Sequence, residues 1–174
     1  MRSLRSAAFA AAAMVCGGAA HAADSEIARG KYLVTLGSCN DCHTPGYFFG
    51  KPDFSRTLAG SDVGFAIPGA GVFVGRNLTP DKETGLGAWT DDQIISAFTA
   101  GVRPDGRRLA PIMPYAGLSH LTPEDAHAIV AYLRSLPPVK NAVPGPFGPK
   151  ETPSTPVFVI VPGETYAKMP APPP

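Results

Sequence analysis

The feature that most constrains this chain is a five-residue stretch, Cys39-Asn40-Asp41-Cys42-His43. Two thiols three positions apart, followed directly by an imidazole, form the C-x-x-C-H pattern typical of covalent haem attachment. Each thiol can form a thioether to one vinyl group of the haem, and His43 then faces the iron as its proximal ligand. The pattern therefore predicts one covalently attached haem c, bound through Cys39 and Cys42.

Other uses of a cysteine pair fit the chain less well. A zinc ribbon needs a second ligand pair at similar spacing, and no cysteine follows residue 42. A thioredoxin-like dithiol closes a strand and opens a helix, and the flanking residues do not predict such a unit. A disulfide across two residues closes too short a loop to stabilise much. A non-haem module that uses the pair for a metal or a disulfide is the remaining alternative.

The N-terminus has the pattern of a secretory signal peptide. Arg2 and Arg5 precede an apolar, alanine-rich run over 7–15, and Ala20-His21-Ala22 offers a cleavage site. The apolar run is too short to span a bilayer. Residues 1–22 are therefore predicted to direct export to the periplasm, with cleavage after Ala22.

Net charge argues against nucleic acid as a partner. The full chain carries a formal +1, and loss of a leader with two arginines and no acidic residue changes it to −1. Binding to phosphates calls for a strongly basic face, which this balance does not supply. Outside the leader no run approaches transmembrane length, so no membrane-spanning segment is expected in the mature chain. Twenty prolines and nineteen glycines predict much ordered loop.

The first and last helices are expected to pack against each other. Asp24-Ser25 predicts an N-cap, and the first helix should run from about Glu26 to Leu36 and end at Gly37. Thr122-Pro123 predicts the start of the last helix. Gly30 leaves a gap where that last helix could approach closely. The apolar face of the last helix is made by Ala126, Ile129, Val130 and Leu133.

Between these helices the sequence predicts a hairpin and a short helix. Two apolar runs over 65–67 and 72–74 flank Pro68-Gly69-Ala70-Gly71, a pattern typical of a short hairpin. Thr90 and Gln93 have capping-box spacing. A short helix should therefore follow Thr90 and end near Gly101.

Residues 140–174 differ in composition from the rest of the chain. Prolines dominate, and Pro156 and Pro162 enclose the short apolar, strand-like run 157–161. A bare apolar pentapeptide favours aggregation, so we expect this run to dock on the domain or on a partner. The predicted organisation is a leader over 1–22, a folded domain over 23–139 and a Pro-rich extension over 140–174.

The second axial ligand decides between electron transfer and ligand binding. Met113 is the candidate, because Pro111 and Pro114 stiffen its loop; a gap-filling core methionine is the alternative. His120 is the main rival, and His127 and Met169 are weaker ones. Four further residues are candidates to contact the haem propionates or Met113, with packing or turn structure at least an equal alternative for each: Arg76, Asn77, Trp89 and Tyr115.

Longer stretches resemble the class I c-type cytochromes, from about Ser25 to Val139. The segment over 30–34 that leads into Cys39–Thr44 is similar to the N-terminal helix and haem site of that family. Other stretches resemble the cytochrome subunits and domains that serve periplasmic alcohol, aldehyde and gluconate-type dehydrogenases: Asn77 to Asp81, Thr84 to Thr90, Met113-Pro114-Tyr115 and Ala131 to Pro138.

The resemblance implies an all-α, small cytochrome c fold with crossed N- and C-terminal helices, to which the patterns above add a short hairpin and a Pro-rich C-terminal extension. It also implies His43 and Met113 as the axial ligands.

Relatives often carry three haems, whereas this chain has one C-x-x-C-H. The expected function is single-electron transfer in the periplasm, from a dehydrogenase or other donor to a cytochrome or oxidase acceptor, without catalysis. The chain is expected to act as a free carrier or as the electron-transfer subunit of a dehydrogenase complex. A haem enzyme or ligand-binding haem protein with an open sixth site is the alternative.

Overall fold

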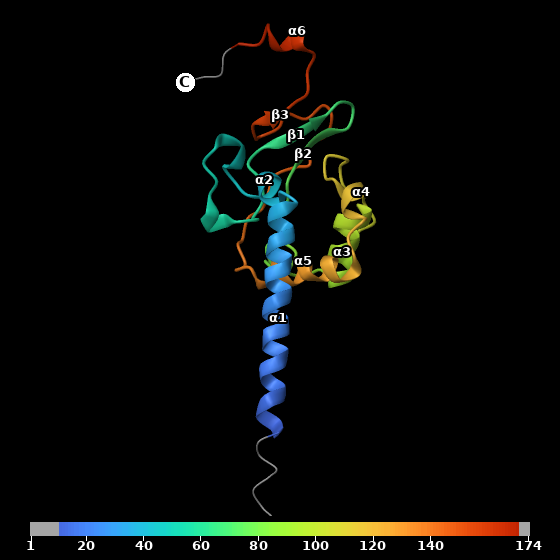
Figure 1. Cartoon of the computed structure of the whole chain (residues 1–174). Coiled ribbons are helices and arrows are strands. Elements are labelled where there is room, and N and C mark those ends of the chain that lie inside the picture. The colour runs from blue at the N-terminus through green and yellow to red at the C-terminus, as the bar shows by residue number, and fades with distance from the viewer. Residues whose placement is uncertain (1–10, 171–174) are drawn as a thin grey trace, which may run out of the picture.

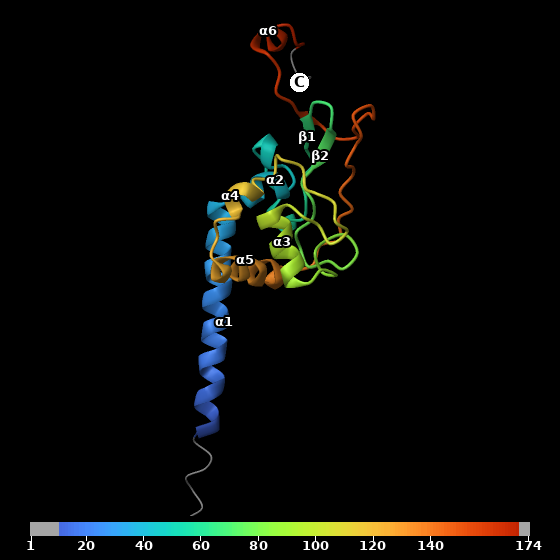
Figure 2. The ribbon, with the colours of Figure 1, turned by 90° about the vertical axis from the view of Figure 1, so that its right-hand side faces the viewer.

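Two crossing helices form the framework of the molecule. The computed structural model describes residues 11–170, with side chains from residue 22 onward. The first helix, α1 (Ala11–Leu36), is crossed by α5 (Pro123–Ser135), as Figures 1 and 2 show. A Cβ placed on Gly30 would lie 1.8 Å from the carbonyl oxygen of Ala128, so the two backbones are in direct contact there. The predicted close approach at Gly30 is confirmed.

The hydrophobic core lies where α1, α3 (Asp91–Ala100) and α5 meet. Val34 of α1 and Val130 of α5 are almost fully buried, with 1% and 2% of their surface exposed. Burial of such side chains stabilises the fold by about 1.5–3 kcal/mol each. The remaining buried members of this cluster are Leu58, Leu86, Ile94, Phe98, Ala126, Ile129 and Leu133.

Helix α1 begins earlier than predicted. The expected start at Asp24-Ser25 is wrong, because the helix already runs through these residues from Ala11. Alanine is the strongest helix former, so an alanine-rich segment joined to the predicted helix continues it. The first ten residues of the predicted leader lie outside the described residues, and its cleavage stays a prediction. Among the helices of residues 11–170, none is long and apolar enough to cross a membrane.

The starts of α3 and α5 follow their local sequence chemistry. The Thr90 hydroxyl accepts a hydrogen bond from the backbone N–H of Gln93, and the Gln93 side chain accepts one from the backbone N–H of Thr90, which completes the predicted capping box. The Thr122 hydroxyl caps α5 with Pro123 in the first turn. Helix α3 ends at Gly101, whose φ of 69° is left-handed. A four-residue helix, α4 (Tyr115–Leu118), lies in the connection between α3 and α5.

A small sheet qualifies the expectation of an all-α fold. Strands β1 (Gly64–Ile67) and β2 (Gly71–Val74) form the predicted antiparallel hairpin, with Phe65 opposite Phe73. A third strand from the extension, β3 (Val157–Phe158), pairs in parallel with β1, so the strand order is β2-β1-β3. The all-α description is therefore only approximate. The strand-like character of this run was predicted, but its pairing with β1 was not, because the two segments lie about 90 positions apart in the sequence.

The first part of the Pro-rich extension packs on the surface of the domain, and its last part extends away from the domain. Val72 and Phe147 exchange two backbone hydrogen bonds of 2.9 Å. Phe158 then packs beside Phe48 and Phe65, with ring centroids 6.1 and 6.0 Å away. Beyond it Ile160 is 86% exposed, and a short helix, α6 (Gly163–Tyr166), extends away from the rest (Figure 1). The apolar run therefore docks on its own domain, but only with its first residues.

Candidate haem site

A sharp turn at the end of α1 places the cysteine motif on a helix of its own. The helix ends at Leu36 as predicted, and Gly37 donates its N–H to the carbonyl of Leu33 at 2.8 Å. Ser38 adopts a left-handed φ of 53°, which redirects the chain into α2 (Cys39–His43). Residues three apart share one face of a helix. Cys39 and Cys42 therefore point to the same side of α2.

Both cysteines are thiols in an apolar environment. They are not bonded to each other. Burial is the main reason that the pKa of Cys39 is raised to about 11, and burial also raises the pKa of Cys42. Both side chains are consequently protonated and neutral at pH 7. Cys39 also packs against the hydrophobic core.

The His43 ring has one nitrogen engaged by the backbone. Its Nδ1 lies 2.7 Å from the carbonyl oxygen of Arg76. A carbonyl oxygen only accepts hydrogen bonds, so Nδ1 carries the proton and Nε2 keeps its lone pair. Burial lowers the pKa of His43, which favours the neutral ring. A neutral imidazole whose second nitrogen is held by a carbonyl is the usual form of a metal-ligating histidine.

The backbone around His43 is fixed from two sides. A Cβ on Gly75 would lie 1.7 Å from the carbonyl oxygen of Cys42, so only glycine lets the end of β2 pass the motif. Gly60 donates its N–H to the carbonyl of His43 at 2.8 Å. Sequence reasoning missed both glycines. For Gly75 the only signal was its position directly after the apolar run 72–74, because glycine in or beside a strand often marks a close backbone approach.

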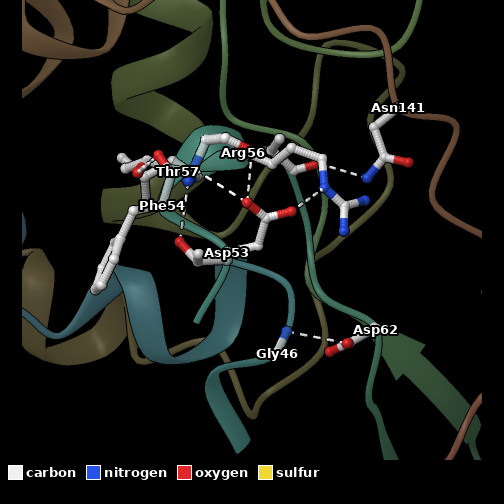
Figure 3. Close-up of polar contacts among 11 residues, drawn as sticks. Gly46, Asp53, Phe54, Arg56, Thr57, Asp62 and Asn141 are labelled. Carbon is white, nitrogen blue, oxygen red and sulfur yellow. Dashed lines mark hydrogen bonds and ion pairs between the residues drawn. The ribbon is translucent and has the colours of Figure 1, made fainter. Parts of the chain in front are cut away.

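The loop after the motif is held by its own polar contacts. It contains two short 3₁₀ turns, η1 (Tyr47–Phe49) and η2 (Phe54–Arg56). In Figure 3 the carboxylate of Asp53 turns back to accept a 2.7 Å hydrogen bond from Arg56 Nε, and Asp62 points to the backbone N–H of Gly46. These contacts join residues within 44–62 and therefore fix the shape of the loop that follows the motif.

Met113 reaches the same hydrophobic core as Cys39. It is half-buried and packs on this cluster. Its loop is tight. The Met113 N–H donates to the carbonyl of Ala110 at 3.0 Å, and the Met113 carbonyl accepts from the N–H of Tyr115 at 2.8 Å. The rival ligands lie on the surface: His120 and His127 are exposed, and Met169 is 50% exposed in the extension.

Arg76, Arg103 and Arg107 form a cluster in which one hydrogen-bond donor has no acceptor. The Arg103 guanidinium stacks on Trp89, 5.3 Å from the ring centroid. Its Nε is buried without a hydrogen-bond partner, and Asp105 Oδ2 at 3.6 Å is too distant to be one. Burial, and then the charges of Arg103 and Arg107, lower the pKa of Arg76. The three guanidinium groups of Arg76, Arg103 and Arg107 therefore lie near one another. An anion beside them would accept a hydrogen bond from the unpaired Nε of Arg103.

Two other predicted contact residues have partners within the chain. Asn77 is 2% exposed; its Oδ1 accepts from the N–H and hydroxyl of Thr79, and its Nδ2 donates to the carbonyl of Val139 at 2.7 Å. It holds the loop that follows β2. The ring of Tyr115 lies under the Arg108 guanidinium at 5.9 Å. For Asn77, the alternative of turn structure describes what is observed.

Family comparison agrees with this arrangement. The cytochrome c family model matches residues 27–137. The chain belongs to the cytochrome c family. Membership implies a covalently bound haem c and a role in electron transport. The matched segment includes the α2 motif, Met113, the part of α1 from residue 27 onward and all of α5, and it ends just before the Pro-rich extension.

Several cytochrome subunits are similar to this cytochrome c chain. The fructose dehydrogenase cytochrome subunit of Gluconobacter japonicus is 36% identical over 128 residues, which cover 70% of this chain and 24% of the relative. The cytochrome c subunit of the quinone alcohol dehydrogenase of Gluconobacter oxydans strain 621H is 35% identical, with 66% and 23% covered. The gluconate 2-dehydrogenase cytochrome c subunit of Pantoea cypripedii is 34% identical, with 68% and 25% covered. The chain therefore spans about a quarter of the length of these relatives.

The residues of the motif fit the haem that the family binds. Addition of a thiol across a vinyl group needs a reduced cysteine, and both cysteines are thiols. The free lone pair of His43 Nε2 suits iron. The unpaired Nε of Arg103 suits an acidic group such as a propionate.

Proposed function

We propose that this chain is a monohaem c-type cytochrome that carries single electrons. Cys39 and Cys42 anchor one haem c, and His43 and Met113 ligate its iron. The observation that carries the proposal is the hydrogen bond from His43 Nδ1–H to the Arg76 carbonyl, which leaves Nε2 as a ligand beside two cysteine thiols. The single C-x-x-C-H motif supports one haem.

The bound haem would supply a one-electron couple between ferrous and ferric iron. The protein contributes the environment of that couple. Helix α2 fixes the attachment points, and the apolar cluster that contacts Cys39 and Met113 excludes water. The buried Nε of Arg103, which has no hydrogen-bond partner, supports a pairing of this guanidinium with a propionate. A thioether ligand and burial both favour the ferrous state, which raises the reduction potential.

The proposed partners are other redox proteins. Relatives of this chain are named as subunits of fructose, alcohol and gluconate dehydrogenases. We therefore place a dehydrogenase on the donor side and a cytochrome or oxidase on the acceptor side. The predicted leader over 1–22 supports the periplasm as the location, since covalent haem attachment and export fit together.

The first experiment is expression with haem attachment in an export pathway. The mature protein should give a c-type pyridine haemochrome spectrum and exceed its polypeptide mass by one haem. Colourless protein without the added mass would refute the proposal.

The second experiment tests the sulfur ligand. Met113→Ala should abolish the far-red sulfur-to-iron absorption, lower the reduction potential and open the ferrous protein to carbon monoxide. Met169→Ala is the matched control, because this methionine is half-exposed in the extension. A Met113→Ala protein with an unchanged spectrum would eliminate Met113. Rapid carbon monoxide binding by the unmodified protein would favour a haem protein with an open sixth site.

A further inference from the structure

Arg76 contacts the motif with its backbone and the extension with its side chain. Its carbonyl oxygen accepts the hydrogen bond from His43 Nδ1 at 2.7 Å. Its guanidinium donates from Nη1 to the carbonyl of Val143 at 2.5 Å and from Nη2 to the carbonyl of Gly145. Both acceptors lie beyond residue 137, where the family match ends. One residue therefore joins the histidine to a segment outside the family domain.

The two carbonyl acceptors are held in place by anchors on either side. Before them, Asn141 donates its side-chain Nδ2–H to the carbonyl of Ala59 at 2.7 Å (Figure 3). After them, Phe147 is paired with Val72 through two backbone hydrogen bonds. The segment over 143–145 is therefore a fixed acceptor for Arg76.

A second contact joins the same segment to the histidine. A Cβ on Gly60 would lie 2.3 Å from Cγ2 of Val143, so the extension packs tightly on Gly60. Gly60 donates its N–H to the carbonyl of His43. The extension thus borders both backbone groups that bind His43.

We propose that the C-terminal extension holds Arg76 by its guanidinium, and that the Arg76 carbonyl in turn sets the orientation and donor strength of His43 toward the haem iron. This inference rests on the proposed function, because it needs His43 as the ligand. Arg76 is a positioning residue. A firm hydrogen bond from Nδ1–H makes the imidazole a stronger donor, and a stronger donor stabilises ferric iron. Loosening the guanidinium should weaken the bond and raise the reduction potential.

The test compares full-length, haem-loaded variants. Arg76→Lys keeps the charge but has a single point of attachment in place of the planar two-pronged guanidinium. Gly145→Ala leaves Arg76 intact and disturbs its acceptor, because Gly145 has a φ of +77° and a Cβ would lie 3.0 Å from the Phe147 ring. Arg108→Lys is the control, since this exposed arginine contacts Tyr115 and not the extension.

Two readouts report on the histidine itself. In Arg76→Lys the His43 Nδ1–H proton, followed by NMR, should exchange with solvent at least about ten times faster. The ferric-to-ferrous ratio at a fixed potential should fall about threefold, which is about 28 mV for a one-electron couple at 59 mV per tenfold. Gly145→Ala should shift both readouts in the same direction, and Arg108→Lys should shift neither.

The possible outcomes separate this inference from the proposed function. A wild-type protein without haem overturns both. A haem-bearing wild type whose Arg76→Lys and Gly145→Ala variants keep the original potential and exchange rate overturns only the role of the extension. Equal shifts in Arg76→Lys and Arg108→Lys also overturn it, because the effect would then belong to any arginine. If Arg76→Lys fails to incorporate haem, the Gly145→Ala result decides.

Discussion

The crossing of α1 and α5 can be tested with one methyl group. In Gly30→Ala the added Cβ would meet three atoms of α5: the carbonyl oxygen of Ala128 at 1.8 Å, its carbonyl carbon at 2.5 Å and Tyr132 Cβ at 2.8 Å. Real Cβ atoms essentially never come closer than 3.0 Å to another non-bonded heavy atom, so the helices must separate by more than about 1 Å. None of the three atoms can move away by a change of rotamer.

The expected cost follows from two opposing effects. Overpacking a core costs about 1–3 kcal/mol, and contact with backbone atoms puts this site at the upper end. Alanine inside a helix is more favourable than glycine by about 1 kcal/mol. The free energy of unfolding should therefore fall by about 2 kcal/mol, which corresponds to a drop of about 4–8 °C in Tm for a domain of this size.

Guanidinium chloride unfolding of the haem-loaded protein, followed by far-UV circular dichroism, measures this change. The matched control is Gly117→Ala in α4, where a Cβ meets nothing within 4 Å. This control should be neutral or stabilising by up to about 1 kcal/mol. A Gly30→Ala protein as stable as the wild type would refute the direct backbone contact between the helices.

Three further changes test the surroundings of the motif. Asn77→Ala removes four hydrogen bonds from a buried loop and should cost about 2–3 kcal/mol; chemical unfolding with a cost below about 1 kcal/mol would contradict this. Gly75→Ala pushes β2 from the backbone of Cys42 and should lower the haem-to-protein ratio after expression, whereas an unchanged ratio would show that β2 yields freely. Asp105 has a pKa lowered to about 2, mainly by its hydrogen bond from Arg107. Its stabilising contribution is complete above the unfolded pKa of about 3.9 and is lost as pH falls from about 4 to 2. Asp105→Asn should therefore flatten the pH dependence of Tm in that window, and identical Tm profiles would exclude this contribution.

Local chemistry made several elements predictable. Thr90 and Thr122 cap their helices through bonds within one turn, so the starts of α3 and α5 could be read from a few adjacent residues. The hairpin was equally local, because its turn residues lie between its strands. The start of α1 was predicted wrongly because the Asp24-Ser25 cap competes with an alanine-rich segment that favours helix on its own.

The candidate site divides in the same way. The motif Cys39–His43 could be recognised because its chemistry depends on spacing along the chain. The Arg76 carbonyl, Gly60 and Gly75 could not be recognised, because they meet the motif only after folding. The unpaired Nε of Arg103 was equally hidden, since burial depends on neighbours far away in sequence.

The sequence by itself predicted the haem attachment points, the starts of α3 and α5 and the end of α1, because thiol spacing and capping bonds span only a few residues. Only the tertiary structure decided which nitrogen of His43 is free and where the extension runs. Those features depend on contacts between residues tens of positions apart: Arg76 with His43 and Val143, and β3 with β1. Such contacts form only when the whole chain has packed, and no short stretch of sequence specifies them.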